Sequence, residues 1–136
     1  MSLLRVNPAS LPRPSGFTHA VVAQCQAGSR VIFLAGQTAT DSSGAVVAGG
    51  VTAQFAQALA NLLTALRASG GQPADLASLT IYAVDLADYR SHAAEIGTAW
   101  LELAGRDYPA TAAVGVAQLW DPAALVELQG HAVIPG

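Results

Sequence analysis

The sequence predicts one α+β domain over residues 1–136, with the element order ββαβαββ and a mixed sheet that carries two helices on one face. Three observations predict this fold class. Two segments place apolar residues at helical spacing, and several short apolar segments have the composition of strands. No linker, internal repeat or low-complexity tract divides the chain. A chain of 136 residues is also long enough to bury roughly two-thirds of its unfolded surface.

The first third of the chain predicts an irregular lead-in followed by two strands. Residues 1–18 are rich in proline, which interrupts regular hydrogen bonding, so we expect no strand there. Residues 19–25 and 30–36 have strand composition and flank the turn sequence Ala27-Gly28-Ser29. The second of them, VIFLAG, is apolar at consecutive positions, which indicates a strand covered on both faces.

The middle of the chain predicts two helices and the strand between them. Residues 52–68 carry a single apolar stripe at helical spacing, and Gly70-Gly71 ends that helix. Residues 79–84 then form a strand. Asp85 and Asp88 are capping residues for a second helix that extends to about Ala104. Gly97 lies inside this helix, where it either costs up to about 1 kcal/mol or permits a close contact.

The composition predicts a protein that covers part of its surface with other copies of itself. Hydrophobic residues make up 52% of the chain and charged residues 11%, below the roughly 25% that is usual for soluble domains. Right-handed crossovers place both helices on one face of the sheet. Apolar residues in the strands nevertheless supply both faces, so packing of sheets between subunits of a homo-oligomer would cover the second face.

Residue types and charge exclude several classes of function. All six basic residues are arginine, which removes Schiff-base chemistry and the P-loop lysine. A net charge of −3 and scattered arginines disfavour a nucleic-acid surface. Cys25 is the only cysteine, so internal disulfides and CxxC sites are excluded, and the histidines lack metal-ligand spacing. No apolar segment has the length of a membrane span or a signal-peptide core, so we expect a cytoplasmic protein.

Residues 108–131 hold the first candidate for chemistry. They predict two apolar strands joined by a loop at residues 119–124. Glu127 is an acidic residue inside a strand-like segment, where carboxylates are seldom buried without a partner or a task. Glu127, Gln129 and His131 alternate, so all three point to one face of the sheet. That face is either a cleft between subunits or a solvated face, or Glu127 pairs with an arginine across an interface.

Several short segments occur along nearly the whole chain in a recognisable order and spacing. They are Asn7-Pro8, residues 15–21 (SGFTHAV), Ala35-Gly36-Gln37, the helix at residues 57–66, residues 80–88 (TIYAVDLAD), Tyr108-Pro109-Ala110 and Leu125-Val126-Glu127. Together they resemble the Rid family of RidA-like and YjgF-like proteins. The resemblance implies a chorismate-mutase-like α+β fold and a homotrimer with a central barrel. A cleft for a small molecule would lie between each pair of neighbouring subunits.

The resemblance also implies a reaction and names two residues for it. Active members of the family hydrolyse reactive 2-imino acids to 2-oxo acids and ammonia, without a metal or cofactor. In them an arginine clamps the substrate carboxylate, and a glutamate in the last strand positions the attacking water. The glutamate corresponds to Glu127, whereas the arginine position is Thr111. Because neutral hydrogen bonds are roughly half as strong as charge-assisted ones, a carboxylate-bearing imine should bind poorly.

Other substrate-binding positions implied by the resemblance have also lost polar groups. Phe17 stands where the family has a tyrosine, Ala93 approximately where it has an asparagine, and Ala113 where a cysteine is common. The backbone groups near Gly36 require no particular side chain and are expected to remain. Together with Thr111, these positions describe a more apolar ligand site than the one that the family implies.

Two functions of different class follow. One is an imine or enamine hydrolase of the deaminase type, whose substrate lacks the usual carboxylate. The other is a non-catalytic trimer that binds a small molecule as a sensor or scavenger. Arg13 or Arg90 would have to replace the missing clamp if the substrate were acidic, although Arg90 has the position of an ordinary solvated charge. Trp120, beside a turn, is expected to fill either a cleft or an interface.

Overall fold

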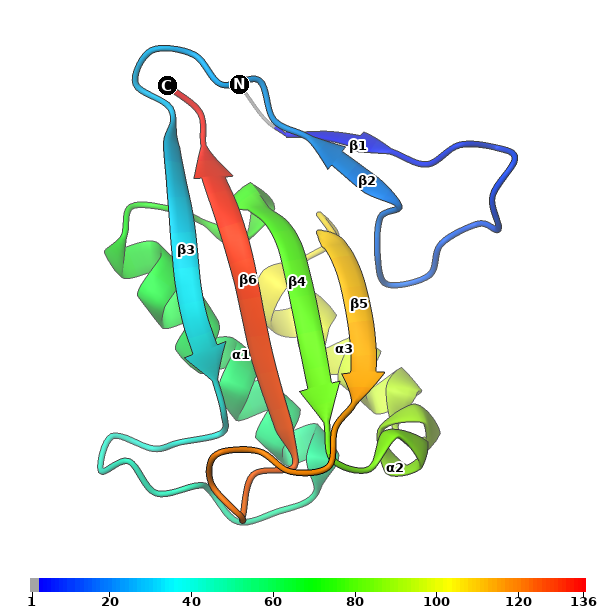
Figure 1. Ribbon diagram of the computed structural model, residues 1–136, viewed down its shortest axis with the longest axis vertical. Helices are drawn as coiled ribbons and strands as arrows, with labels where there is room; N and C mark the ends of the chain where they lie inside the picture. The colour runs from blue at the N-terminus through cyan, green and yellow to red at the C-terminus, as the bar shows by residue number, and fades with distance from the viewer. Residues whose placement is uncertain (1–2) are drawn as a thin grey trace.

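A four-stranded mixed sheet forms the body of the structure, a computed structural model that describes residues 3–136 (Figure 1). Its strands are β3 (Arg30–Gln37), β4 (Leu76–Ala83), β5 (Ala110–Gly115) and β6 (Val126–Ile134). The strand order is β3-β6-β4-β5. β6 runs antiparallel to β3 and to β4, whereas β4 and β5 are parallel. A helical crossover therefore joins β4 to β5, as the sequence predicts.

The helices all lie on one face of this sheet, behind it in Figure 1, which confirms that prediction. They are α1 (Val51–Ala68), α2 (Leu86–Ser91) and α3 (Ala93–Ala104), and a short 3-10 helix, η1 (Pro73–Asp75), precedes β4. None of the helices among residues 3–136 combines the length and the apolarity that a membrane span requires.

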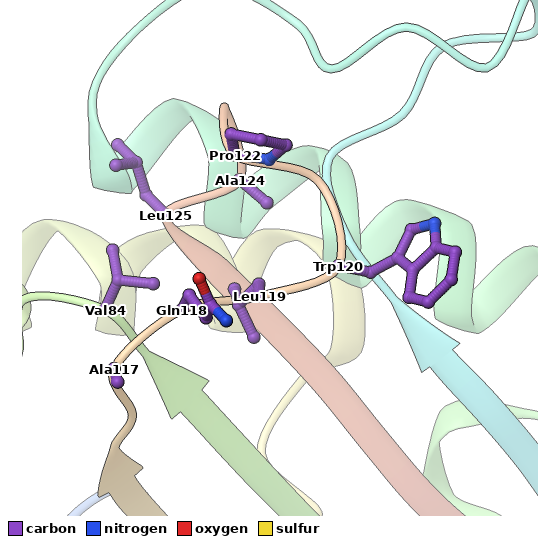
Figure 2. A pocket seen from close by; sticks show the side chains of 8 residues that line it. All are labelled: Val84, Ala117, Gln118, Leu119, Trp120, Pro122, Ala124 and Leu125. Atoms are coloured by element: carbon purple, nitrogen blue, oxygen red, sulfur yellow. The ribbon is translucent and has the colours of Figure 1, made fainter.

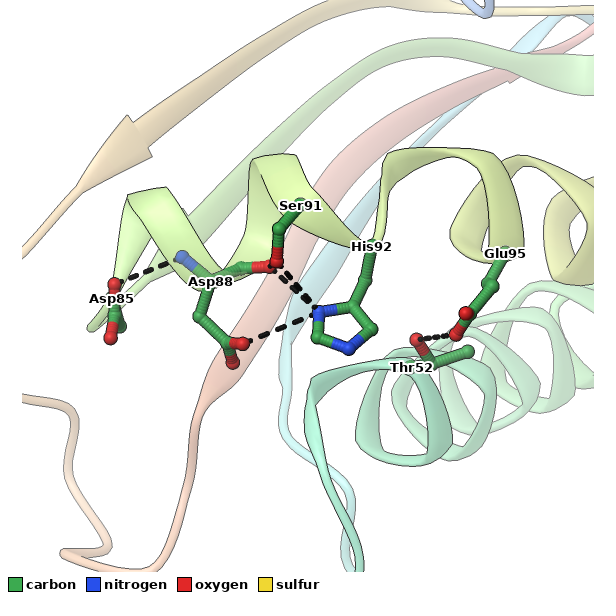
Figure 3. A network of polar contacts seen from close by, with 6 residues as sticks. All are labelled: Thr52, Asp85, Asp88, Ser91, His92 and Glu95. Carbon is green, nitrogen blue, oxygen red and sulfur yellow. Dashed lines mark hydrogen bonds and ion pairs between the residues drawn. The ribbon is translucent and has the colours of Figure 1, made fainter.

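The second predicted helix is divided into α2 and α3 at His92 (Figure 3). Asp85 caps α2 as expected, because its carboxylate accepts a hydrogen bond from the backbone N–H of Asp88 at 3.0 Å. His92 leaves the helical conformation with φ −106° and ψ 13°. Its ring nitrogen Nδ1 lies 2.9 Å from the backbone oxygen of Asp88 and 3.3 Å from the carboxylate of the same residue. This polar junction stabilises the point where the helix axis changes.

The core lies between α1 and the sheet. Phe55, Leu59, Leu62, Leu63 and Leu66 form the predicted stripe, and each has no more than 1% of its surface exposed. They pack with buried residues of β4 and β6 in one continuous cluster. Full burial of such a side chain is worth roughly 1.5–3 kcal/mol, so this single helix face supplies much of the hydrophobic stabilisation.

The N-terminal region differs from the prediction. A strand, β1 (Leu4–Val6), lies inside the lead-in that we expected to be irregular, and it pairs antiparallel with β2 (Ala20–Val22). The predicted strand over residues 19–25 is therefore shorter, and it pairs with β1 rather than with its neighbour β3. The prolines do not prevent this pairing because all of them follow β1 in the chain.

Arg5 ties this two-stranded ribbon to the rest of the molecule. Besides Leu3 O, its guanidinium group donates hydrogen bonds to three backbone oxygens that are distant in the sequence, those of Tyr108 at 3.0 Å, Ala74 at 3.1 Å and Asp107 at 3.2 Å. Nothing in the local sequence indicates these partners, because the closest of them is 69 residues away. The long-range contacts of this side chain therefore help to position the ribbon.

The face of the sheet opposite the helices, called the open face below, is turned toward the viewer in Figure 1. Phe33 is 78% exposed and Val31 51% exposed on β3, and Val114 on β5 is exposed as well. The consecutive apolar residues of β3 do supply both faces, as the sequence indicates, since Leu34, which follows Phe33, is buried on the helix side.

Candidate functional site

Glu127 lies on the open face, near the start of β6. It alternates with the buried residues Val126 and Leu128 and pairs in register with Tyr82 of β4. Gln129 and His131 follow on the same face, which confirms that the three side chains point the same way. Among residues 3–136 the one ion pair is that of His92 with Asp88. Glu127 is therefore half-buried without an arginine partner from its own chain.

Gly36 lies directly against the Glu127 carboxylate. A Cβ atom built at Gly36 would come within 2.5 Å of Glu127 Oε2 and 2.9 Å of its carboxyl carbon. The pairing of β3 with β6 also shifts register between Leu34 and Gln37, so the chain carries a β-bulge at this point. Bulges occur often beside functional sites because they interrupt the ladder and redirect backbone groups. Gly36 thus provides space and an irregular backbone next to the carboxylate.

Ala93 and Thr111 lie on the other side of the sheet, and Phe17 lies at its β5 edge. Thr111 pairs in register with Leu79, whose side chain is buried against the helices. Thr111 and Ala93 line one cavity between α3 and the β4–β5 pair. Thr111 and Phe17 line a shallow groove at the edge of β5. The N-terminal segment reaches this edge because Thr18 donates its backbone N–H to Pro109 O at 3.1 Å.

The sheet therefore separates two groups of predicted residues within one chain. Gly36 and Glu127 meet on the open face, Ala93 and Thr111 lie on the helix face, and Phe17 lies at the edge of β5. Ala113 pairs with Ile81, so it has the same facing as Thr111, but it is exposed and lines neither the cavity nor the groove.

The arginines do not restore the missing clamp within the chain. Arg13 and Arg90 are both exposed, and neither lines the cavity or the groove that contains Thr111. The hydroxyl of Thr111 donates a hydrogen bond to Pro109 O at 2.9 Å, so its remaining capacity toward a ligand is that of an acceptor. A carboxylate, which accepts only, would find no donor in this side chain.

The cavity between α3 and the β4–β5 pair has buried polar groups of its own. Burial raises the pKa of Tyr89 to about 12, so its phenol stays protonated at neutral pH. The indole N–H of Trp100 is buried, and within residues 3–136 it is the side-chain polar group that lacks a hydrogen-bond partner. An unsatisfied buried donor costs roughly 1–3 kcal/mol. The unpaired indole N–H of Trp100 is therefore unusual for a residue packed in an apolar core.

A larger hollow of about 640 Å³ lies beneath the loop of residues 116–125, at the end of the sheet (Figure 2). Its lining includes Val84, Leu119 and Leu125 but no acidic, basic or histidine side chain. Trp120 is 98% exposed and points away from the other side chains of the hollow. Within one chain Trp120 fills no cleft, and its packing at an interface stays a prediction.

The sequence reasoning missed Gln54, which holds this loop in place. Its side chain is 3% exposed, donates to Ala123 O at 3.1 Å and accepts from the Leu125 backbone N–H at 2.8 Å. Gln54 precedes Phe55 on the buried side of α1, so a polar residue at the edge of the apolar stripe was the available signal. His131, for its part, contacts Ser78 at 2.9 Å and the ring of Phe33. Nothing among residues 3–136 groups three or more histidine, cysteine or acidic side chains around a metal position.

Comparisons with known proteins agree with this geometry. Residues 13–134 match the family model described as endoribonuclease L-PSP. A solved structure of YyfB from Yersinia pestis, a Rid-family protein of unknown function, is 33% identical, with 98% of this chain and 100% of that chain covered and a TM-score of 0.86. The YjgF gene product of E. coli is 26% identical over 86% of this chain and 87% of its own, with a TM-score of 0.67. Rv2704 from Mycobacterium tuberculosis, a member of the YjgF/YER057c/UK114 family, is 27% identical, with 88% of this chain and 87% of that chain covered and a TM-score of 0.64. A comparison with curated proteins gave no match.

Proposed function

We propose a function from the premise that the chain belongs to the endoribonuclease L-PSP family, the family of the Rid and YjgF proteins. The protein is a hydrolase of an uncharged imine or enamine, and Glu127 positions the attacking water. The observation that carries this proposal is the Glu127 carboxylate on the open face, unpaired within its own chain and in contact with the bulged backbone at Gly36.

The complete site is formed by two copies of the chain in a homotrimer. One subunit contributes the open-face pair Gly36 and Glu127, and its neighbour contributes the groove with Phe17 and Thr111. Two features support this arrangement. Thr111 and Glu127 lie on opposite faces of the sheet in one chain, and the open face exposes apolar side chains such as Phe33 that would be covered by another subunit.

The reaction needs one water molecule and no metal or cofactor. Glu127 accepts a proton from water while the water oxygen forms a bond to the imine carbon. Glu127 passes this proton to the nitrogen, which gives a neutral carbinolamine. The hydroxyl proton of the carbinolamine then moves to the nitrogen as the C–N bond breaks, so that ammonia leaves and the carbon becomes a carbonyl, with Glu127 again unprotonated. Thr111 in place of a cationic side chain selects a substrate without a carboxylate. The net charge of −3 and the lack of lysine disfavour RNA as the substrate, because RNA is normally held by clustered basic groups.

Release of ammonia from a neutral imine tests this function. The imine of a simple ketone or aldehyde should be hydrolysed faster than the imine of a 2-oxo acid. Glu127→Gln should lower the rate by about 10²–10⁴-fold, the usual contribution of general acid–base catalysis. Glu102→Gln removes the same charge from an exposed position on α3 and should have no effect. Full activity of the Glu127→Gln variant would rule out the water-positioning role.

The trimer and the alternative function have tests of their own. Light scattering should give three times the 13.8 kDa of one chain, and the mass of a single chain would remove the shared site. The alternative, a non-catalytic sensor or scavenger, is favoured by the absence of charged side chains from the cavity that contains Thr111. A ligand retained in native mass spectrometry, without turnover of any imine, would decide for the alternative.

A further inference from the structure

A cavity of about 190 Å³ lies between α3 and the β4–β5 pair, and it is called the α3 cavity below. Phe55, Leu79, Ile81 and Ile96 line it, and all four are buried core residues. A dry cavity of roughly 150 Å³ with such walls is sufficient to bind benzene. The α3 cavity therefore has the size and the surface to hold one ring.

Small residues on two of its walls create this volume. Ala93 and Gly97 of α3 and Thr111 of β5 all line the α3 cavity. A Cβ atom built at Gly97 would meet no atom within 4 Å, so this glycine does not permit a tight contact between elements. Glycine is unfavourable inside a helix. At Gly97 its effect is to leave open space in the wall of the cavity.

The polar side chains of the α3 cavity are all neutral, and they are those of Ser15, Tyr89, Trp100, Tyr108 and Thr111. No aspartate, glutamate, lysine, arginine or histidine lines it. Tyr89 keeps its phenolic proton, and the buried indole N–H of Trp100 has no partner among residues 3–136. A charged group would lose its hydration here without gaining an opposite charge. A neutral acceptor would instead accept a hydrogen bond from the phenol of Tyr89, which lines the cavity.

We propose that the α3 cavity binds the ring-sized apolar part of an uncharged substrate that also carries a hydrogen-bond acceptor. The substrate class is that of aryl or branched-alkyl carbonyl compounds and their imines. This inference rests on the proposed function and specifies its substrate. Thr111 connects the two sites, because it lines both the α3 cavity and the groove beside Phe17.

Three small molecules separate the requirements of size, charge and hydrogen bonding. Acetophenone has a ring and an acceptor, ethylbenzene has the ring alone, and benzoate adds a negative charge. Their binding is followed by fluorescence of Trp100 in the Trp120→Phe variant, which removes the exposed second tryptophan of the chain. Acetophenone should bind saturably and at least about tenfold more tightly than benzoate. Ethylbenzene should bind up to about tenfold more weakly than acetophenone for the loss of one hydrogen bond.

Equal or tighter binding of benzoate would overturn the assignment of an uncharged ligand. Equal affinities for acetophenone and ethylbenzene would overturn the acceptor requirement. If the change in Trp100 emission grew with acetophenone concentration without reaching a plateau, acetophenone would have no defined binding site. That result would overturn the proposal as a whole.

Filling the cavity provides the structural control. Gly97→Leu places a side chain into the open space of the cavity. Because this side chain would overlap with the bound ring, acetophenone should bind at least about tenfold more weakly. Ala93→Leu also narrows the cavity, and Ala93 is exposed. This variant is therefore the second test of cavity filling if Gly97→Leu impairs folding. Thr98→Leu is the matched control, because Thr98 is exposed on α3 and does not line the cavity. Unchanged binding in both filled variants would overturn the proposal.

Binding and catalysis are expected to fail separately. Hydrolysis of neutral imines without acetophenone binding would leave the proposed function intact and remove the α3 cavity from it. Acetophenone binding without hydrolysis of any neutral imine would leave the cavity assignment intact and remove the proposed function.

Discussion

The two faces of the four-stranded sheet are made by alternate residues of the same strands, yet they differ sharply. On the helix face Leu62, Leu76 and Leu128 are fully excluded from solvent. On the open face Phe33 is 78% exposed, beside the polar residues Gln129 and His131. Burial on one face alone supplies the stability of the chain, because apolar surface contributes only where water is removed. The open face is left available for recognition and for the Glu127 carboxylate.

Of the substitutions considered for the two faces, truncation of a core leucine should have the largest effect on stability. Leu62→Ala leaves a cavity between α1 and the sheet and should lower the free energy of unfolding by about 2–5 kcal/mol. Urea denaturation at a fixed protein concentration measures this loss. A change below about 1 kcal/mol would contradict the assignment of α1 as the main source of burial.

Phe33→Ala on the open face is the matched substitution. We expect it to weaken association between subunits while the fold of each chain is retained, because Phe33 contributes little burial within one chain. Light scattering and urea denaturation at two protein concentrations measure the two effects. A large loss of stability that does not depend on protein concentration would show that Phe33 belongs to the core of the single chain.

An intermediate loss of stability is expected at Gln54 of α1, which holds the loop that leads into β6. Gln54→Met keeps the approximate size of the side chain but leaves Ala123 O and the Leu125 N–H without their partner. The expected cost is about 1–3 kcal/mol, measured by urea denaturation. Gln57→Met is the control on the same helix, since Gln57 donates only to the side chain of Asn61. Equal stability losses in the two variants would contradict the role of Gln54 in holding the loop.

The smallest effect is expected at the exposed junction of α2 and α3. The hydrogen bond to the backbone oxygen of Asp88 raises the pKa of His92 above its usual 6.5, and the nearby Asp88 and Glu95 carboxylates act in the same direction. The protonated ring therefore favours the folded state. This contribution is complete below pH 6.5 and is lost as the pH rises through the higher pKa of the folded protein.

Thermal unfolding between pH 6 and pH 9 tests this contribution. The Tm should decline slightly with rising pH in the unmodified chain, and His92→Asn should flatten that decline while it leaves the open face unchanged. The same pH dependence in both proteins would show that His92 makes no such contribution. The effect is small because the junction is solvated and the charges are screened.

Patterns within one segment predicted the elements, whereas partners distant in the sequence decided their arrangement. The stripe of α1, the cap at Asp85 and the shared facing of Glu127, Gln129 and His131 depend on local spacing, and all three are confirmed. β1 was missed because its partner strand and the oxygens that Arg5 contacts lie far along the chain. The break at His92 was also missed, because it depends on side-chain contacts that helical spacing does not reveal.

The sequence by itself determined the family resemblance, the amphipathic α1 and the identities of Glu127 and Thr111 as candidate residues. The tertiary structure decided that these two residues lie on opposite faces of one sheet and that Gly36, not an arginine, adjoins the carboxylate. It also decided that Gly97 opens a cavity rather than a close contact. The physical reason is that residue spacing sets the facing of a side chain within its own element, while strand register and helix packing set what that side chain meets.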